Sequence, residues 1–327
     1  MNVLVTGGAG YIGSITVTAL LARGHDVVVL DDLSTGHRAA VPAAASFVHA
    51  DIGDRDSVLR AVEERSVDAV MHFAAASLVG ESMTDPLRYY HNNVSGSIAL
   101  LDAVLAGGVR RFVLSSTAAL FGTPDSVPIA ETAAIRPESV YGETKFVVER
   151  LLAWLAQTRG LGYTTLRYFN AAGASDDQGE DHDPETHLIP IVLQVAAGRR
   201  PHVKVFGSDY ATPDGSAIRD YVHVLDLAAA HVLAIESIDP GSGRAYNLGS
   251  GTGFSVREVI DTCRAVTGHA IPEVVAPRRA GDPPVLVADS SKARRELGWR
   301  PRYDDLAEIV ASAWRWRQAN PDGYPRS

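Results

Sequence analysis

Short apolar runs alternate with segments of helical periodicity through the first half of the chain. The apolar runs are rich in β-branched residues and lie at residues 3–6, 26–32, 46–51, 68–75, 111–116 and 163–170. The segments with helical periodicity are residues 15–24, 56–64, 92–108 and 141–159. Apolar strands without strict alternation that are separated by helices indicate a parallel sheet covered on both faces. The pattern therefore predicts an α/β fold built on a doubly wound parallel sheet.

This regular alternation ends near Asn170. Residues 173–187, GASDDQGEDHDPETH, are polar and acidic without periodicity, so they predict a loop. His182 and His187 lack a convincing ligand spacing, and a solvated surface loop is a better interpretation of this stretch than a metal site. We expect residues 1–170 to form a Rossmann domain whose sheet is completed by a later segment near 219–240. Residues 171–327 are expected to form mostly a smaller α/β domain that binds the substrate.

The composition narrows the classes of protein. The 327 residues are 46% hydrophobic and 21% charged, which is enough apolar material for a sizeable core. The formal net charge of −9 argues against nucleic acid or an anionic membrane surface as a partner, because both need a basic footprint. The chain starts directly in a strand pattern and has no apolar run of about 20 residues, so we expect a soluble cytoplasmic protein. The single cysteine, Cys263, lies in a helix-like stretch and is expected to be a buried apolar residue.

A glycine-rich turn follows the first predicted strand. Gly7, Gly10 and Gly13 in GGAGYIG have a spacing that lets backbone N–H groups approach a pyrophosphate at the start of a helix. Asp31 ends the second predicted strand, 18 residues after Gly13. A carboxylate there accepts hydrogen bonds from a ribose 2′-hydroxyl and repels a 2′-phosphate. The chain is therefore predicted to bind NAD rather than NADP.

A hydroxyl, a phenol and an ammonium group are predicted to converge beside this nucleotide site. Thr117 follows the strand at 111–116, and Tyr141 and Lys145 lie one turn apart on the next helix. A phenol with a pKa of about 10 is a poor base at neutral pH. A nearby lysine and the positive charge of oxidised nicotinamide favour the phenolate, which makes Tyr141 a candidate general base. A Tyr–Lys pair arises by chance on many helices, so its position after a nucleotide loop and a strand-end hydroxyl carries the inference.

These motifs are similar to those of the extended short-chain dehydrogenase/reductases and, within them, the UDP-glucose 4-epimerases. The resemblance rests on GGAGYIG and on Thr117, Tyr141 and Lys145, and it runs nearly from end to end. Further matching segments are VGES (79–82), YYHNNVSG (89–96), RYFNAAGA (167–174), HLIP (187–190), FGSDYATPDGSAIRDYVHVLDLA (206–228), YNLGSG (246–251), APRRAGD (276–282) and LGW (297–299).

The resemblance implies an enzyme that interconverts UDP-glucose and UDP-galactose with tightly bound NAD. It implies transient oxidation at C4 of the sugar, rotation of the 4-keto sugar and return of the hydride. Tyr141 would take the proton of the 4-hydroxyl, Lys145 would bind the nicotinamide ribose and lower the Tyr141 pKa, and Thr117 would hydrogen-bond the reacting oxygen.

The resemblance also implies the remaining contacts, with no metal ligand among them. The residues expected at NAD are Gly7, Gly10, Tyr11, Ile12, Gly13, Asp31, Asp32, Asp51, Ile52, Phe73, Ala74, Ser77, Tyr141 and Lys145. The residues expected at the UDP-sugar are Asn92, Thr117, Asn170, Leu188, Phe206, Arg219, Tyr221, Arg279 and Asp282. Ser77 departs from the family pattern, because many epimerases have a lysine there, and one cofactor contact differs accordingly.

The identity of the sugar stays open at this point. Leu286 lies where the family sets the size of the sugar pocket. A large tyrosine there tends to restrict relatives to plain hexoses, small residues admit N-acetylated sugars, and leucine is intermediate. A 4-epimerase of an N-acetylhexosamine, a uronic acid or a pentose is therefore the alternative.

Two other functions are disfavoured. A 4,6-dehydratase needs an Asp–Glu acid–base pair directly after the strand-end hydroxyl, but Ala118 and Ala119 follow Thr117. A catalytically inactive NAD-binding scaffold or sensor predicts loss of Tyr141 or Lys145, and both are present.

Helices 92–106 and 141–159 look amphipathic. The family pairs such helices between two subunits, so the resemblance implies a homodimer.

Overall fold

The computed structural model describes residues 1–279 and 282–325, and it confirms the predicted fold class. A seven-stranded sheet, with all neighbouring strands parallel, has the order β11-β6-β5-β4-β1-β2-β3. Its strands are β1 (Asn2–Thr6), β2 (Asp26–Asp31), β3 (Ser46–His49), β4 (Ala69–His72), β5 (Arg111–Thr117), β6 (Gly162–Tyr168) and β11 (Gly243–Leu248). The strand order reverses between β1 and β4, and ligands of doubly wound sheets bind at such a point.

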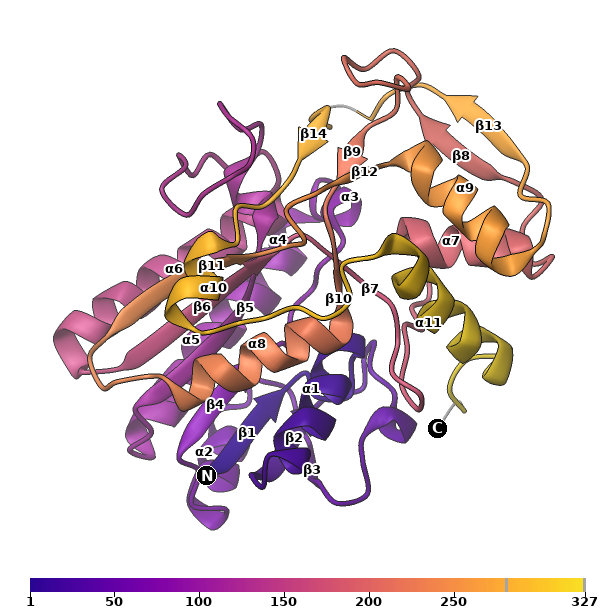
Figure 1. Cartoon of the computed structure of the whole chain (residues 1–327). Coiled ribbons are helices and arrows are strands. Elements are labelled where there is room, and N and C mark those ends of the chain that lie inside the picture. Colours follow the sequence, from indigo (N-terminus) through magenta and orange to yellow (C-terminus); the bar gives the residue numbers. More distant parts are fainter. Residues whose placement is uncertain (280–281, 326–327) are drawn as a thin grey trace.

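Helices cover both faces of this sheet (Figure 1). On one face α1 (Tyr11–Ala22) packs against α8 (Val224–Glu236). The other face is covered by α2 (Arg55–Glu64), α5 (Gly96–Ala106) and α6 (Val140–Arg159). Because both faces are buried, the central strands need apolar side chains in both directions, which explains their continuous apolar runs.

Short helices complete the first domain. They are η1 (Arg38–Ala40), α3 (Val79–Ser82), α4 (Pro86–Tyr89), η2 (Tyr90–Ser95), η3 (Ala118–Phe121) and α10 (Ser291–Glu296). The sequence predicts one helix over 92–108, whereas the structure has a π-helical segment, η2, that continues into α5. π-helical turns occur often at functional sites because they redirect side chains. Here the π-helical segment carries the buried Asn93.

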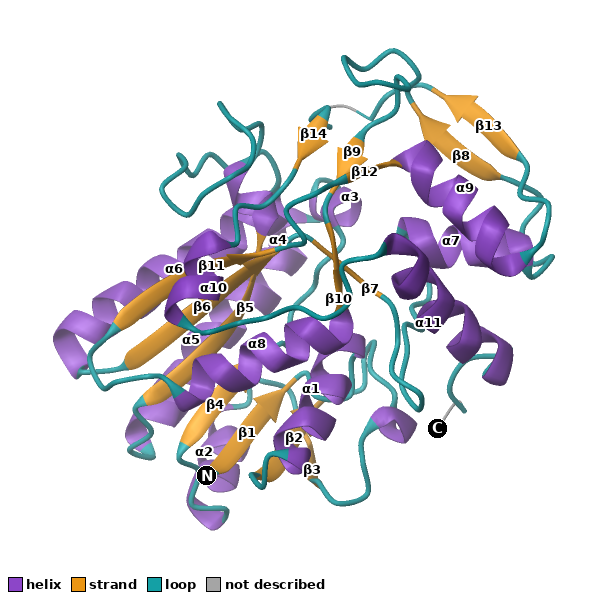
Figure 2. Cartoon of the chain, in the orientation of Figure 1, coloured by secondary structure: helices purple, strands orange, loops and turns teal. Residues whose placement is uncertain are grey.

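The second domain has a separate core and lies beside the carboxyl ends of the strands (Figures 1 and 2). Its helices are α7 (Leu188–Ala196), α9 (Val256–Thr267) and α11 (Leu306–Ala319). Its short strands are β7 (Asn170–Ala172), β8 (Val203–Phe206), β9 (Ile218–Arg219), β10 (Tyr221–His223), β12 (Phe254–Ser255), β13 (Glu273–Ala276) and β14 (Val285–Leu286). Cys263 is fully buried in this core, and burial raises its pKa to about 12, so the thiol is the inert residue that the sequence predicts.

The chain returns from the second domain to the first through α8 and β11. The sequence predicts that a segment near 219–240 completes the sheet. In the structure this range contains α8, which covers the sheet, while the strand that joins it is β11, at 243–248. β11 pairs with β6 from Gly243 opposite Tyr163 to Leu248 opposite Tyr168. Its sequence, GRAYNL, mixes polar and apolar residues because it lies at an edge of the sheet, and this weakens the strand signal.

The loop at 175–186 differs from the solvated surface loop that the sequence predicts. Gln178, Glu180 and Glu185 are buried. The Gln178 amide donates to the Ala40 carbonyl oxygen at 2.7 Å, and a Cβ at Gly179 would lie 2.2 Å from the Trp316 ring. The polar composition is explained by internal hydrogen bonds and ion pairs rather than by exposure to water.

No helix within residues 1–279 and 282–325 is long and apolar enough to span a bilayer.

A buried ion pair fastens α6 to the sheet. The Arg167 guanidinium on β6 donates to Glu149 Oε2 at 2.5 Å and to Glu149 Oε1 at 3.1 Å, and the Ser116 hydroxyl donates to Oε1 at 2.6 Å. Both charged side chains are more than nine-tenths buried. Ser139 caps the start of α6, because its side-chain oxygen accepts from the Gly142 N–H at 3.1 Å. The position of Tyr141 and Lys145 in space therefore depends on these contacts.

We expect Glu149→Ala to destabilise the protein by about 3–5 kcal/mol, because it leaves Arg167 as an unpaired buried cation. The free energy of unfolding, measured by urea titration, checks this. Asp125→Ala is a matched control, because it removes the carboxylate of the exposed Arg136–Asp125 pair and should cost less than about 1 kcal/mol. Equal losses in the two variants would contradict the structural role of Glu149.

Candidate active site

The glycine loop lies between β1 and α1, where the structure leaves no room for larger residues. Gly7 has a positive φ of +72°, and a Cβ there would lie 2.4 Å from the Ala74 nitrogen. A Cβ at Gly13 would lie 2.2 Å from the Gly7 carbonyl oxygen. Gly10 is the N-cap of α1 and provides no side chain to cap it. The free N–H groups of the first helical turn therefore form an anion-binding site at the end of the strands.

Three carboxylates lie after the second and third strands. Asp31 is buried and accepts hydrogen bonds from the Ala9 and Leu33 N–H groups, both at 2.9 Å. Burial raises the pKa of Asp31 despite these two hydrogen bonds. The carboxylates of Asp32 and Asp51 are exposed and are each oriented by a backbone N–H two residues further on. Asp31 thus lies against the glycine loop, at the position that sequence reasoning gives to a ribose ligand.

The chain after β4 passes close to the glycine loop. The Phe73 ring lies against the His231 ring in a tilted arrangement with centroids 4.6 Å apart, and the Ala74 N–H donates to the Thr6 carbonyl oxygen at 3.1 Å. Ser77 is exposed. Asn93 holds this segment in place, because its side chain hydrogen-bonds both the N–H and the carbonyl of Ala76 at 2.9 Å.

The Asn93 side chain also donates to the Thr144 hydroxyl on α6, at 3.0 Å. It therefore links the segment after β4 to the helix that carries Tyr141 and Lys145. Sequence reasoning did not single out Asn93 and named the neighbouring Asn92 as a substrate contact. A one-residue change on a helix turns a side chain by about 100°, so the two asparagines point in different directions. Two adjacent asparagines give no signal for choosing between them.

Thr117, Tyr141 and Lys145 come together at the carboxyl end of β5. The Thr117 hydroxyl lies close enough to the Tyr141 phenol to lower its pKa. The Lys145 ammonium is buried and donates to the Ser115 carbonyl oxygen at 3.0 Å. The Ser115 hydroxyl contacts the Tyr168 hydroxyl, so a second phenol lies close by. The structure thus brings the three predicted catalytic side chains to one place.

The protonation state of Tyr141 in this group differs from that of a general base, which acts as a phenolate. Burial raises the pKa of Tyr141 to about 12, and the Thr117 hydroxyl lowers it less than burial raises it. Burial lowers the pKa of Lys145 to about 8, although Glu149 acts in the opposite direction. Burial thus favours the neutral phenol at Tyr141, whereas nearby positive charge favours the phenolate.

Arginines and aromatic rings lie together on the second domain. Arg219 on β9 forms an ion pair with Asp282 and donates to the Ile218 carbonyl oxygen at 2.7 Å. The Arg279 guanidinium lies over the Phe206 ring, 4.2 Å from its centroid. Stacking on a ring leaves the edge of the guanidinium free for phosphate oxygens. Four of the predicted substrate residues therefore form two pairs, Arg219 with Asp282 and Arg279 with Phe206.

Leu286 connects this surface to the catalytic turn. It lies opposite Arg219 in the parallel pairing of β14 with β9. Its side chain packs against the cluster that includes Ala118 and Phe121, directly after Thr117. Sequence reasoning assigns Leu286 to the sugar pocket. In the structure Leu286 therefore lies between the arginines and the turn that follows the Thr117 hydroxyl.

The other predicted substrate residues lie around this surface. Asn170 begins β7 and donates to the Asp220 carbonyl oxygen at 2.9 Å, and Leu188 is the first residue of α7. Asn92 is partly buried, and its amide donates to the Asn93 side chain at 2.9 Å. Tyr221 is buried in the core of the second domain, where burial raises its pKa.

Sequence reasoning also missed Asp220. It is fully buried, and its carboxylate accepts from the N–H groups of Ser250, Gly251 and Ala288 at 2.7–3.0 Å. Asp220 follows Arg219 in the motif IRDY, and a carboxylate is rarely buried without partners. The acid in this motif is therefore a signal that sequence reasoning could have used. Asp220 therefore holds two separate segments, at 250–251 and at Ala288, next to β9.

The fold and site define a nucleotide-dependent enzyme of a known family. The sequence profile of the NAD dependent epimerase/dehydratase family matches residues 3–249, and the chain belongs to this family. It is 50% identical to UDP-glucose 4-epimerase of Lacticaseibacillus casei, over 99% of each chain. It is 53% identical to UDP-glucose 4-epimerase of Streptomyces lividans, over 98% of this chain and 97% of the relative.

The solved structures agree with this assignment. The crystal structure of UDP-glucose 4-epimerase from Bifidobacterium longum in complex with NAD+ and UDP superimposes with a TM-score of 0.95. The identity is 37%, and the match covers 99% of this chain and 100% of that one. The resemblance inferred from the sequence motifs is confirmed.

The pKa of Lys145 predicts a rise of stability with pH. Its folded-state pKa of about 8 lies below its ordinary value, so between pH 8 and about 10.5 the unfolded chain binds more protons and the folded state gains stability. Relative to Lys145→Met, the ligand-free wild type should gain up to about 2 kcal/mol between pH 7.5 and 9.5. Urea titrations at both pH values measure this. Lys204→Met, at an exposed position on β8, should leave the wild-type pH dependence intact, and a Lys145→Met curve parallel to wild type would refute the prediction.

Proposed function

We propose that this chain interconverts UDP-glucose and UDP-galactose with NAD as its bound cofactor. The observation that carries the proposal is the convergence of Thr117, Tyr141 and Lys145 beside a glycine loop, opposite a surface with two arginines. Relatives that match over almost the whole chain are UDP-glucose 4-epimerases, which supports the same reaction.

The residues around the glycine loop fit a dinucleotide. The close approaches at Gly7 and Gly13 leave the backbone, and no side chains, against the pyrophosphate. We infer that Asp31, oriented by the Ala9 and Leu33 N–H groups, accepts hydrogen bonds from the adenosine ribose. We also infer that Lys145, oriented by the Ser115 carbonyl oxygen, donates to the nicotinamide ribose. The contacts proposed around these are Tyr11, Ile12, Asp32, Asp51, Ile52, Phe73, Ala74 and Ser77. NAD, when bound, supplies reversible hydride transfer at C4 of the sugar.

Tyr141 moves the proton in this reaction. Its phenolate accepts the proton of the 4-hydroxyl during oxidation and returns a proton to the oxygen on the opposite face. Burial raises the pKa of Tyr141, so the phenolate forms only when positive charge lies close to it. The oxidised cofactor brings such a charge beside Tyr141, and a protonated Lys145 adds to it. Thr117 hydrogen-bonds the reacting oxygen and keeps it within reach of Tyr141.

The second domain holds the diphosphate while the sugar turns over. Arg219 and Arg279 supply the positive charge, and bidentate guanidinium groups suit phosphate oxygens. Asp282 orients Arg219 by their ion pair. The proposed lining of the sugar and uracil sites is completed by Asn92, Asn170, Leu188, Phe206 and Tyr221. We infer that the sugar is held mainly through the UDP portion, so that space beside Leu286 lets the 4-keto sugar rotate.

Incubation of the purified protein with UDP-galactose should produce UDP-glucose, and the interconversion is followed by chromatography. Tyr141→Phe should keep bound NAD, detected by its absorbance after denaturation, and lose at least about 100-fold in turnover because the general base is missing. Val140→Ala, next to Tyr141 on α6, serves as a control for local packing. Wild-type turnover in Tyr141→Phe would refute the assignment of the base, and no interconversion by the NAD-loaded wild type would refute the function.

We also infer that two copies pair through α5 and α6. A groove between these helices is lined by Ile98, Leu101, Asp102, Leu105, Ala106, Arg110, Leu151, Leu155 and Arg159. Ile98 is 50% exposed and Trp154 is 60% exposed, which is costly for large apolar side chains in a monomer. The apolar floor and the rim of both charge signs suit a two-fold interface, in which one surface meets its own copy.

Light scattering should give a mass twice that of the 34.8 kDa chain. Trp154→Glu places a charge in the proposed interface and should shift the mass toward that of one chain. Val275→Glu is the matched control, because Val275 is 52% exposed on β13, far from α5 and α6. A wild-type mass of one chain contradicts the pairing.

A further inference from the structure

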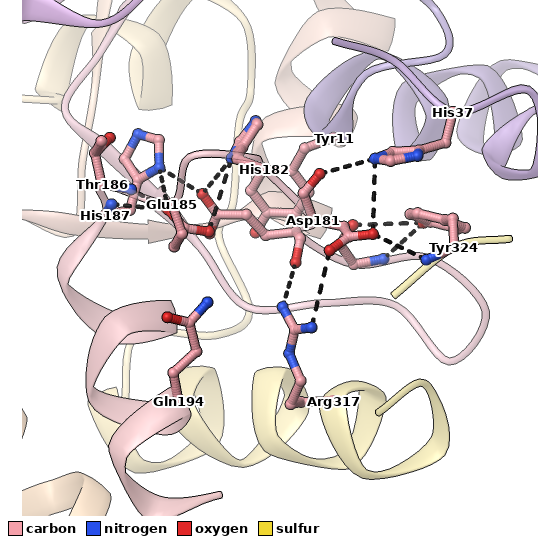
Figure 3. Close-up of polar contacts among 12 residues, drawn as sticks. Tyr11, His37, Asp181, His182, Glu185, Thr186, His187, Gln194, Arg317 and Tyr324 are labelled. Carbon is pink, nitrogen blue, oxygen red and sulfur yellow. Dashed lines mark hydrogen bonds and ion pairs between the residues drawn. The ribbon is translucent and has the colours of Figure 1, made fainter. Parts of the chain in front are cut away.

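Four ionisable side chains with metal-binding atoms converge in the loop before α7. They are Glu180, His182, Glu185 and His187, and their ligand atoms all lie within 4.8 Å of one another. Figure 3 shows His182, Glu185 and His187 turned toward one another, whereas Asp181 points away, toward His37, Arg317 and Tyr324. The proposed reaction uses none of these four side chains.

The distances within this group suit a small cation. The Glu180 oxygen lies 3.1 Å from His182 Nδ1 and 2.7 Å from His187 Nδ1. Glu185 Oε1 lies 3.1 Å from His187 Nδ1, and Glu185 Oε2 lies 4.0 Å from His182 Nδ1. Ligand atoms around a tetrahedral Zn²⁺ are about 3.4 Å apart, given metal–ligand distances of about 2.1 Å. The observed separations lie on both sides of this value.

The Glu185 carboxylate is an independent indication that this group of side chains binds a cation. Its side chain is 2% exposed. Oε1 accepts from the Thr186 N–H at 2.7 Å and the His187 N–H at 2.8 Å, so the carboxylate is fixed in direction. Oε2 is buried and has no hydrogen-bond partner within the described part of the chain. It faces His182 across a gap that is too long for a hydrogen bond. A buried carboxylate oxygen without a donor is expensive unless a cation satisfies it.

The charges of the group also balance a divalent ion. Without a metal, two buried carboxylates are neutralised only if both imidazoles are protonated. A divalent cation with two neutral imidazoles and two carboxylates has the same total charge of zero. Nitrogen ligands favour transition metals over Mg²⁺ or Ca²⁺.

We propose that a structural metal site is formed by Glu180, His182, Glu185 and His187. The site binds one divalent transition metal ion, and Zn²⁺ is the ion that it is expected to prefer. The ion fastens the loop to the start of α7, where Leu188 follows His187. It also lies beside the glycine loop, because the Tyr11 ring meets His182 edge-on with centroids 6.3 Å apart. The site therefore braces two segments that the proposed active site uses, without taking part in its chemistry.

The test uses tag-free full-length protein that has been stripped with chelator and dialysed. Titration with Zn²⁺, followed by calorimetry and elemental analysis, should give one tightly bound ion per chain. Co²⁺ should give the visible absorption bands of a four-coordinate site, and Zn²⁺ should raise the thermal midpoint of the wild type. His182→Ala and Glu185→Gln should each weaken Zn²⁺ binding by about 100-fold or more.

His269→Ala, which removes an exposed imidazole after α9, is the control and should bind Zn²⁺ like the wild type. Circular dichroism of the metal-free variants checks that they fold, and Glu185→Gln keeps the shape of the side chain if His182→Ala does not fold. The proposal would be overturned if the wild type took up no Zn²⁺ saturably, or if Glu185→Gln bound Zn²⁺ as tightly as the wild type. Either result would show that the two glutamates and two histidines form only ion pairs with one another. Because the titration contains no nucleotide sugar, its outcome is independent of the epimerase assay.

Discussion

The buried pair of Glu149 and Arg167 couples the catalytic helix to the sheet. Tyr141, Lys145 and Glu149 follow one another at four-residue intervals, so they lie along one face of α6. Glu149 is fixed by Arg167 on β6 and by Ser116 on β5, and this sets how α6 lies across the strand ends. Lys145 can then reach the Ser115 carbonyl oxygen, and Tyr141 can reach Thr117. The pair costs desolvation of two charges, so it specifies geometry more than it adds stability.

The same constraint explains the electrostatics of the site. A helix held tightly against the strand ends buries its phenol and its ammonium group, and burial disfavours the charged form of each. Burial therefore favours the protonated form of Tyr141. In the proposed reaction, Lys145 and the positive charge of oxidised nicotinamide together favour the phenolate, as the sequence motifs predict.

The second domain depends on a different set of buried contacts. Asp220 gathers the segments at 249–251 and 288 around β9, and Leu286 on β14 reaches the turn after Thr117. The loop at 175–187 packs between α1 and α11 through Gln178, Gly179 and Asp181. Each of these contacts joins residues far apart in the sequence. The surface around β9 and the packing of the loop therefore depend on tertiary contacts.

The sequence by itself determined the doubly wound fold, the glycine loop, and the pairing of Tyr141 with Lys145. These features depend on local periodicity, on turn residues and on neighbours within one helix, all of which are written in short stretches of chain. Only the tertiary structure decided that β11 completes the sheet, that Asn93 holds the segment after β4, and that Glu180, His182, Glu185 and His187 converge. An edge strand has a weak apolar pattern, and adjacent asparagines differ only in direction. A loop whose carboxylates are buried has the same composition as one exposed to water, so the difference lies in packing partners that no local pattern encodes.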